Sequence, residues 1–245
     1  SRTLYAAVFD RGVYKSTDDG ASWEPRNNGI TSNFNAWRLV MLPDSSLYLL
    51  VARGMRRGQP VDGAVYRSRD GAESWQRVRL PDGVNAPNDL AYDPADPQRL
   101  YLACWPTTIG GREYAGGVYA SDDGGENWTC VFDESKHVYG IAVDPDAPST
   151  LYINTFDNGE YRSDNRGASW RRLKGYNFKW GHAPFLDPHR KDRLYLTTFG
   201  SSVWVGPRDG DDEAFEDVVP VLTEQFTVGK GAMTRDRSSD AGLSR

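Results

Sequence analysis

The sequence of 245 residues predicts an all-β fold, a β-propeller of four-stranded antiparallel blades. Three observations support this prediction: a Leu-Tyr pair recurs along the chain, a second short apolar run follows each pair, and Gly and Asp separate the runs. Successive pairs lie 43, 53, 51 and 43 residues apart, beginning at Leu4, Leu47, Leu100, Leu151 and Leu194. Short strands that repeat about every 40–50 residues are typical of propeller blades.

Each unit has the same order of elements. An inner strand ends at an Asp-Pro pair in three units, at Asp93, Asp144 and Asp187, each seven residues before the Leu. The Leu-Tyr strand comes second. The third strand carries an apolar-aromatic or similar pair, at 13–14, 65–66, 118–119, 160–161 and 203–204. A hairpin and an outer strand complete the unit, which repeats because only a neighbouring blade can cover its apolar face.

Four of the third strands continue into a shared motif, STDDGASW at 16–23, SRDGAESW at 68–75, SDDGGENW at 121–128 and SDNRGASW at 163–170. We expect the carboxylate to accept backbone N–H groups across the hairpin, the Gly to supply the turn conformation, and the Trp to fill the gap between blades. Ala72 stands in a Gly position and Asn165 in an Asp position. The fifth unit lacks the motif.

The motif resembles the Asp-box, or BNR repeat, of sialidases, sortilin-type receptors, xyloglucan hydrolases and related propellers, over about residues 1–206. The resemblance implies that these side chains hold the hairpins on the face away from the ligand, rather than acting as acids, bases or calcium ligands. The residues concerned are Ser16, Asp18, Gly20, Trp23, Ser68, Asp70, Trp75, Ser121, Asp123, Gly125, Trp128, Ser163, Asn165, Gly167 and Trp170.

We predict five blade units near 1–35, 36–86, 87–136, 137–178 and 179–219, followed by a tail at 220–245. The first unit lacks an inner strand, and two interpretations follow. The chain is part of a larger propeller, which we favour, or the segment 223–229 returns to supply the missing strand and close a five-bladed ring. The last 15 residues have a composition typical of disorder.

Composition excludes several functions. The net charge of −5 and the lack of a basic block disfavour nucleic acid, and no apolar run is long enough to span a membrane. No cofactor is indicated, and no metal-ligand spacing occurs. The third strand separates Cys104 from Cys130 by about 9–10 Å, beyond the roughly 4.4–6.8 Å of a disulfide, so we expect two free and mostly buried thiols. No signal peptide is present, but we expect a secreted or periplasmic module.

The predicted ligand face carries the loops that join blades and those between second and third strands. Two of these second loops are long, at 53–63 and 105–117, and the first contains Arg53, Arg56 and Arg57. Alignment on Asp-Pro places aromatic, amide and imidazole side chains at the tops of the inner strands, a set that suits carbohydrate. The candidate ligand-binding residues are Trp37, Asn88, Trp105, Tyr139, Tyr176, Phe178, Trp180 and His182. The alternative for Phe178 and Trp180 is that they only fill the gap between blades four and five.

The sequence favours a carbohydrate-binding or glycoside hydrolase-like module, with a polysaccharide or oligosaccharide as partner. Asp10 and Asp157 are weak catalytic candidates, because they occupy matching second loops and equally suit a repeated turn. No convincing acid/base pair emerges. The Arg-Ile-Pro motif of sialidases is missing. The alternative is a non-enzymatic interaction propeller of the sortilin or assembly-factor type, which binds a protein or the rest of a larger parent chain.

Overall fold

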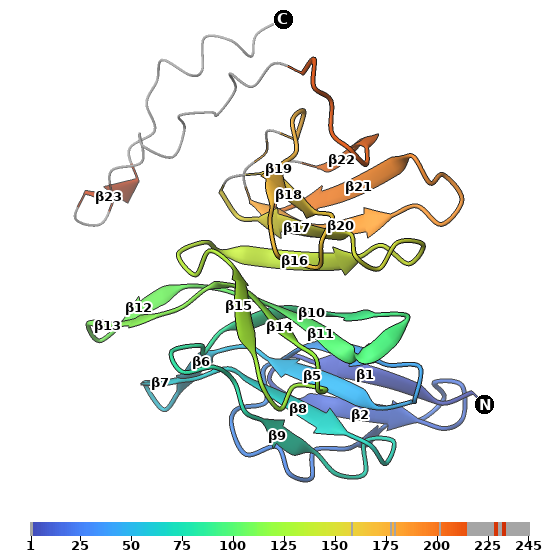
Figure 1. Cartoon of the computed structure of the whole chain (residues 1–245). Coiled ribbons are helices and arrows are strands. Elements are labelled where there is room, and N and C mark those ends of the chain that lie inside the picture. The colour runs from blue at the N-terminus through green and yellow to red at the C-terminus, as the bar shows by residue number, and fades with distance from the viewer. Residues whose placement is uncertain are drawn as a thin grey trace, which may run out of the picture.

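The computed structural model describes residues 2–157, 159–176, 178, 180–200 and 202–214, together with the backbone of 228–229 and 232–233. These residues form strands and no helix, so none of them contributes a membrane-spanning helix. The sheets are antiparallel and follow one another from β1 and β2 to β21 and β22 (Figure 1). This architecture is the predicted propeller.

Five sheets correspond to the five predicted units. The first contains β1 (Leu4–Val8), β2 (Gly12–Ser16) and β3 (Glu24–Pro25), and the second β4 (Ala36–Met41), β5 (Leu47–Val51), β8 (Ala64–Ser68) and β9 (Gln76–Val78). The third contains β10 (Pro87–Asp93), β11 (Asp96–Cys104), β14 (Gly117–Ser121) and β15 (Thr129–Phe132). The fourth contains β16 (Val138–Val143), β17 (Leu151–Thr155), β18 (Glu160–Ser163) and β19 (Arg171–Arg172), and the fifth β20 (Gly181–Leu186), β21 (Arg193–Thr198) and β22 (Val203–Pro207).

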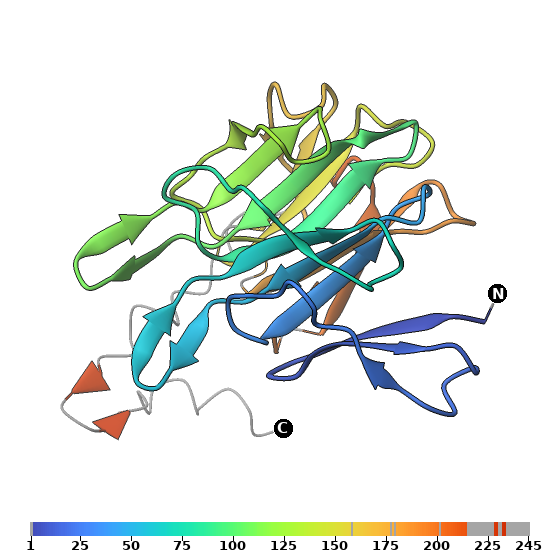
Figure 2. The same cartoon turned by 90° about the horizontal axis from the view of Figure 1, so that it is seen from below.

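The two long second loops fold into hairpins of their own. One contains β6 (Gly54–Arg56) and β7 (Gln59–Val61), and the other β12 (Thr107–Ile109) and β13 (Arg112–Tyr114). Both hairpins project from the same side of the molecule (Figures 1 and 2). Of the segment 223–229, residues 223–227 lie outside the described residues, and β23 (Val228–Gly229) pairs with β24 (Ala232–Met233).

The core lies between successive blades, as the repeat predicts. Each of four buried clusters joins residues of two neighbouring sheets; one of them packs Leu50 of blade two against Leu102 of blade three. The Leu-Tyr strands of blades two to four lie deep in this core, where Tyr48, Tyr101 and Tyr152 are at most 2% exposed. Burying a side chain of this size stabilises the fold by roughly 1.5–3 kcal/mol.

The motif hairpins have the hydrogen bonds that the sequence predicts. Asp18 accepts from the backbone N–H of Ser22 at 2.8 Å and from its hydroxyl at 2.7 Å, and these bonds lower the pKa of Asp18 to about 2. Asp70 and Asp123 repeat the arrangement, and both pKa values are likewise lowered to about 2. Asn165 accepts the equivalent backbone bond from Ser169 at 2.8 Å, so the fourth hairpin keeps its form.

The motif tryptophans tie each hairpin to the preceding blade. The indole N–H of Trp75 donates to the carbonyl of Arg26 at 2.8 Å, and Trp128 and Trp170 donate equivalently to Arg79 and Val131. Trp23, in the first blade, donates within its own hairpin to Gly20 and is 40% exposed. In blades two, three and four the indole therefore joins its own blade to the preceding one.

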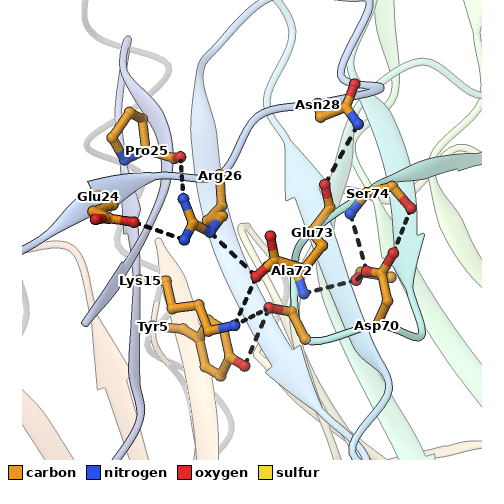
Figure 3. A network of polar contacts seen from close by, with 12 residues as sticks. Tyr5, Lys15, Glu24, Pro25, Arg26, Asn28, Asp70, Ala72, Glu73 and Ser74 are labelled. Carbon is orange, nitrogen blue, oxygen red and sulfur yellow. Dashed lines mark hydrogen bonds and ion pairs between the residues drawn. The ribbon is translucent and has the colours of Figure 1, made fainter. Parts of the chain in front are cut away.

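A polar network reinforces the same junction between blades one and two (Figure 3). Lys15 donates to the carbonyl of Gly71 at 2.9 Å and pairs with Glu73 at 3.0 Å, while Arg26 lies 3.4 Å from Glu73. The next junction repeats the pattern, because Tyr48 and Arg67 both donate at 2.9 Å to the carbonyl of Gly124. A cation and a tyrosine of one blade thus bind the hairpin carbonyl of the next.

The two cysteines are free, as predicted, but the expected burial of both is wrong for one. Cys104 ends the second strand of blade three and is fully buried. Cys130 lies on the outer strand β15 and is exposed, because no strand of its own sheet pairs with the far edge of β15.

Candidate functional site

A register shift interrupts the inner strand of each blade from the second to the fifth. In every case the shift skips one residue: Trp37 on β4, Asn88 on β10, Tyr139 on β16 and His182 on β20. A β-bulge leaves its extra residue outside the ladder and re-aims the side chain, and bulges are frequent beside binding sites. Asn88, Tyr139 and His182 are the three residues that the Asp-Pro alignment predicts to be equivalent, and Trp37 was expected close to their level.

A second set of aromatic residues meets the bulged ones. Trp105, Phe156 and Phe199 directly follow the second strands of blades three, four and five, and each lies five residues after the Leu of its Leu-Tyr pair. Phe156 and Phe199 were not among the sequence candidates. Alignment on Leu-Tyr contains the signal that finds them, since Phe9 also occupies this position and only Ala52 breaks the aromatic series.

Tyr139 is the centre of the resulting aromatic cluster. Its ring centroid lies 4.8 Å from that of Phe199, 5.5 Å from His182 and 6.2 Å from Trp37. The side chain is 9% exposed, and this burial raises the pKa of its phenol. The cluster brings together four blades and contains Trp37, Trp105, His137, Tyr139, Phe156, His182 and Phe199.

One part of the cluster is a continuous stack. His137 lies flat against Trp105, with ring centroids 4.1 Å apart, and against Phe156 at 4.7 Å, while the guanidinium carbon of Arg53 lies 4.7 Å over the Trp105 ring. His137 and Arg53 therefore cover part of the Trp105 ring, which is only half-buried. Trp105 is part of the support beneath the site.

The imidazole of His137 is held in its neutral form. The side-chain nitrogen of Asn88 lies 3.2 Å from Nε2 of His137 and donates to the carbonyl of Val138 at 3.0 Å. Since the amide nitrogen only donates, Nε2 is the acceptor and the ring proton is assigned to Nδ1. Burial, together with the positive charge of Arg53, lowers the pKa of His137 to about 3.

Three large rings on or beside the cluster remain open to solvent. Trp37 is 37% exposed, Trp180 40% and Phe199 41%. Trp180 and Phe199 are linked through the backbone, because the N–H of Phe199 donates to the carbonyl of Trp180 at 2.7 Å. These rings are the surfaces on which a flat, partly apolar ligand can stack.

Two sequence candidates lie in the core instead. Tyr176 is 2% exposed and Phe178 4%, and both pack with Trp204 between blades four and five. The Tyr176 hydroxyl donates to the carbonyl of Pro207 at 2.8 Å. Their side chains are not available to a ligand, which agrees with the alternative interpretation of Phe178 as a residue that fills the gap between blades. Trp180, by contrast, is exposed.

The weak catalytic candidates lie in short exposed turns on this face. Asp10 is in the three-residue connection between β1 and β2, with a φ of 63°, and Asp157 follows Phe156 in the corresponding connection of blade four. An Asp at a left-handed turn position has a sufficient structural reason to be there.

A buried ion pair was missed by sequence reasoning. Asp89 follows the bulged Asn88, is 3% exposed and lies 2.7 Å from the guanidinium of Arg38. It accepts backbone hydrogen bonds from Leu90 and Ile141, yet burial raises its pKa to about 6 against the opposing effect of Arg38. The pair lines a cavity of about 460 Å³ between the inner strands, just below the aromatic cluster.

The structure is thus a propeller with an aromatic cluster at one end of its inner strands. Comparison with known proteins shows what the chain is similar to. No protein-family model matches the chain. A xyloglucanase of Hypocrea jecorina is 28% identical over 283 residues, covering 95% of this chain and 32% of that protein. The xyloglucanase Xgh74A of Acetivibrio thermocellus is 26% identical over 246 residues, covering 85% and 28%. The photosystem II assembly protein Ycf48 of Thermosynechococcus vestitus is 29% identical over 136 residues, covering 54% and 33%.

Solved structures give the same fold. The GH74 enzyme of Niastella koreensis superposes with a TM-score of 0.68 at 20% identity, covering 85% of this chain and 34% of that one. The GH74 xyloglucanase of Xanthomonas campestris gives 0.63 at 19% identity, with 84% and 34% covered. The chain spans about a third of the length of the curated relatives named above.

Proposed function

We propose that this chain is a polysaccharide-binding, glycoside hydrolase-like propeller module whose ligand lies across the aromatic cluster. The observation that carries the proposal is the set of four register shifts, which leave Trp37, Asn88, Tyr139 and His182 outside the ladder at the same end of the inner strands. Exposed rings such as that of Trp37 stack on the C–H faces of sugars, and the half-buried imidazole of His182 is suited to binding their hydroxyls, with Asn88 supporting the site from below. The similarity to xyloglucanases supports xyloglucan as the ligand. It also supports an extracellular or periplasmic location.

The site supports binding more strongly than hydrolysis. Glycoside hydrolysis generally needs two carboxyl groups about 5–9.5 Å apart across the scissile bond. Among the described carboxyl groups of this region, Asp10 and Asp157 are exposed in turns, Asp89 is paired with Arg38, and Glu160 is fully buried. We therefore propose that hydrolysis, where it occurs, does not depend on Asp10 or Asp157. Replacing either by Asn should leave the rate unchanged.

The test is electrophoresis of the purified chain through gels that contain xyloglucan, another neutral glucan or no polysaccharide. We expect xyloglucan to retard the chain, and Trp37→Ala to weaken binding about tenfold, the loss of about 1.4 kcal/mol of ring contact. Trp23→Ala is the matched control, because Trp23 is similarly exposed but lies on the opposite, hairpin end of its blade. Equal retardation of both variants, or none with any polysaccharide, would reject the proposal.

The second candidate is a protein-binding assembly propeller. It is favoured by the similarity to Ycf48 and by the two hairpins, β6–β7 and β12–β13, that extend from the ligand face. Deleting the tip 57–58 or 110–111 would then abolish partner capture and leave binding to polysaccharide intact. The two candidates thus make opposite predictions for Trp37→Ala and for the hairpin deletions.

A further inference from the structure

Glu160 places a carboxyl group at a position where three other blades have valine. It is the first residue of β18 and lies three residues before the motif Ser, where the other blades have Val13, Val65 and Val118. All four side chains are 0% exposed. Neither oxygen of Glu160 accepts a hydrogen bond from any described group. An ionised carboxylate is not stable in such surroundings, because burial without partners costs several kcal/mol.

A second unsatisfied oxygen lies on the facing strand. Asn154 on β17 is the direct register partner of Glu160, so the two side chains point to the same face of the sheet, toward blade five. The side-chain oxygen of Asn154 is buried and has no donor. A protonated Glu160 has one O–H donor, and the side-chain oxygen of Asn154 is an acceptor that otherwise has no donor. Burial also raises the pKa of Glu160 well above its ordinary value, which favours the protonated form.

The pair lies directly below the aromatic cluster. The side-chain nitrogen of Asn154 is 3.5 Å from the carbonyl of Thr197, and the Thr197 hydroxyl is 3.0 Å from Nδ1 of His182. Asn154 also packs so tightly against Gly181 that a Cβ there would collide with its oxygen. Phe156 follows two residues later. A change in charge at Glu160 thus acts on the strands that present His182 and Phe156.

Among the described residues of the surrounding strands, no charged group donates a hydrogen bond to Glu160. The phenols of Tyr152 and Tyr176 are neutral, since burial raises their pKa values, in Tyr176 with help from Glu160 itself. The titratable and charged groups that β17 to β21 and the following loop contribute to this junction are Tyr152, Arg162, Arg172, Tyr176, His182 and Arg193, and none donates to either Glu160 oxygen.

We propose that Glu160 and Asn154 form an acid-dependent latch beneath the ligand site, closed by a neutral Glu160 and loosened when Glu160 ionises. Its effect on ligand binding rests on the proposed function, whereas its effect on folding does not. The protonated form stabilises the junction of blades four and five and holds His182 and Phe156 in place. Ionisation at higher pH opens that junction and weakens the site above it.

The sign of the pH dependence follows from linkage. A carboxyl group whose pKa is raised by folding contributes stability that is complete below its unfolded-state value of 4.5 and is lost as pH rises. Between the unfolded-state and folded-state pKa values, each pH unit multiplies the unfolding constant by up to ten, because one proton is released on unfolding.

The experiment compares the full chain with Glu160→Gln between pH 4.5 and 9, using urea unfolding and retardation by xyloglucan. Glutamine has the size of the neutral acid and supplies an N–H donor at every pH. We expect the ratio of the two unfolding constants, that of the Glu chain over that of the Gln chain, to increase with pH. Over the same range, the affinity of the Glu chain for xyloglucan should fall relative to that of the Gln chain. Asp89, His137 and His182 titrate in both chains, so their effects cancel in these ratios.

Two results would overturn the proposal. Unfolding constants that keep a fixed ratio across this pH range would show that Glu160 does not titrate as proposed. If the Gln variant fails to fold, Glu160→Val repeats this test, because it introduces the residue that the other blades have at this position. A ratio that increases while relative affinity stays constant would remove the link to the site. Absence of any retardation would reject the proposed ligand and leave the unfolding test of the latch intact.

Discussion

The indole N–H of Trp37 donates a hydrogen bond of 3.1 Å to the backbone carbonyl of Asn88, the residue at the equivalent bulge of the next blade. The Asn88 side chain continues the link to His137 and to the carbonyl of Val138 in blade four. The bulges are therefore fixed relative to one another before any ligand binds. Such preorganisation lowers the entropy that binding must overcome.

Asn88→Leu should show how far the site depends on this link. The change leaves the Val138 carbonyl and the His137 acceptor without a donor in a buried position, which costs about 1–3 kcal/mol. We expect the free energy of unfolding, measured in urea, to fall by that amount and polysaccharide binding to weaken with it. A variant with wild-type stability and binding would show that the amide is dispensable.

The motif tryptophans should differ in importance according to their neighbours. Trp75 is 3% exposed and donates to the preceding blade, so Trp75→Ala should cost about 3–5 kcal/mol. Trp23→Ala should cost much less, since Trp23 is bonded only within its own hairpin. Thermal unfolding of the two variants measures the difference. Similar losses would contradict the assignment of Trp75 as an inter-blade contact.

Asn165→Asp should stabilise the fourth hairpin. An ionised Asp would accept the N–H and hydroxyl of Ser169, as Asp18 accepts those of Ser22. The pKa values of the three motif Asp residues are lowered by folding to about 2 from 3.8, so the added stability should be present above pH 4 and lost as pH falls toward 2. Melting curves of both chains at pH 7 and pH 2.5 test this, and a gain that is equally large at the two pH values would contradict the proposed cause.

The two thiols should differ in reactivity. Cys130 is exposed, whereas Cys104 is fully buried and burial raises its pKa. A maleimide should therefore label one thiol in the native chain and two in urea, with Cys130 identified by mass spectrometry. Labelling of Cys104 under native conditions would show that the core of blade three opens readily.

The fold was predictable because its determinants are local and repeated. Leu-Tyr, Asp-Pro and the hairpin motif recur at fixed distances, and each has a contact that only a neighbouring blade can complete. The site was predictable in part for the same reason, since counting back from Asp-Pro identifies Asn88, Tyr139 and His182. Phe156 and Phe199 needed a second alignment, on Leu-Tyr.

The remaining site features depend on what covers a residue, which spacing does not encode. The ring of Trp105 is covered by Arg53 from another blade, and Tyr176 lies beneath the loops rather than on them. The pairing of Asp89 with Arg38 and the burial of Glu160 in a valine position also arise from contacts between blades. The sequence contains these residues without indicating their partners.

The four register shifts have a consequence for how this face can change. The bulged residues lie outside the strand ladder, and among them Trp37 is also exposed whereas Asn88 is buried. The exposed ring of Trp37 can be exchanged with far less cost to folding than the buried Tyr152, which holds two blades together. The molecule thereby separates a packed scaffold from a surface that tolerates change, and under the proposed function libraries confined to positions 37 and 182 should alter which polysaccharide is bound.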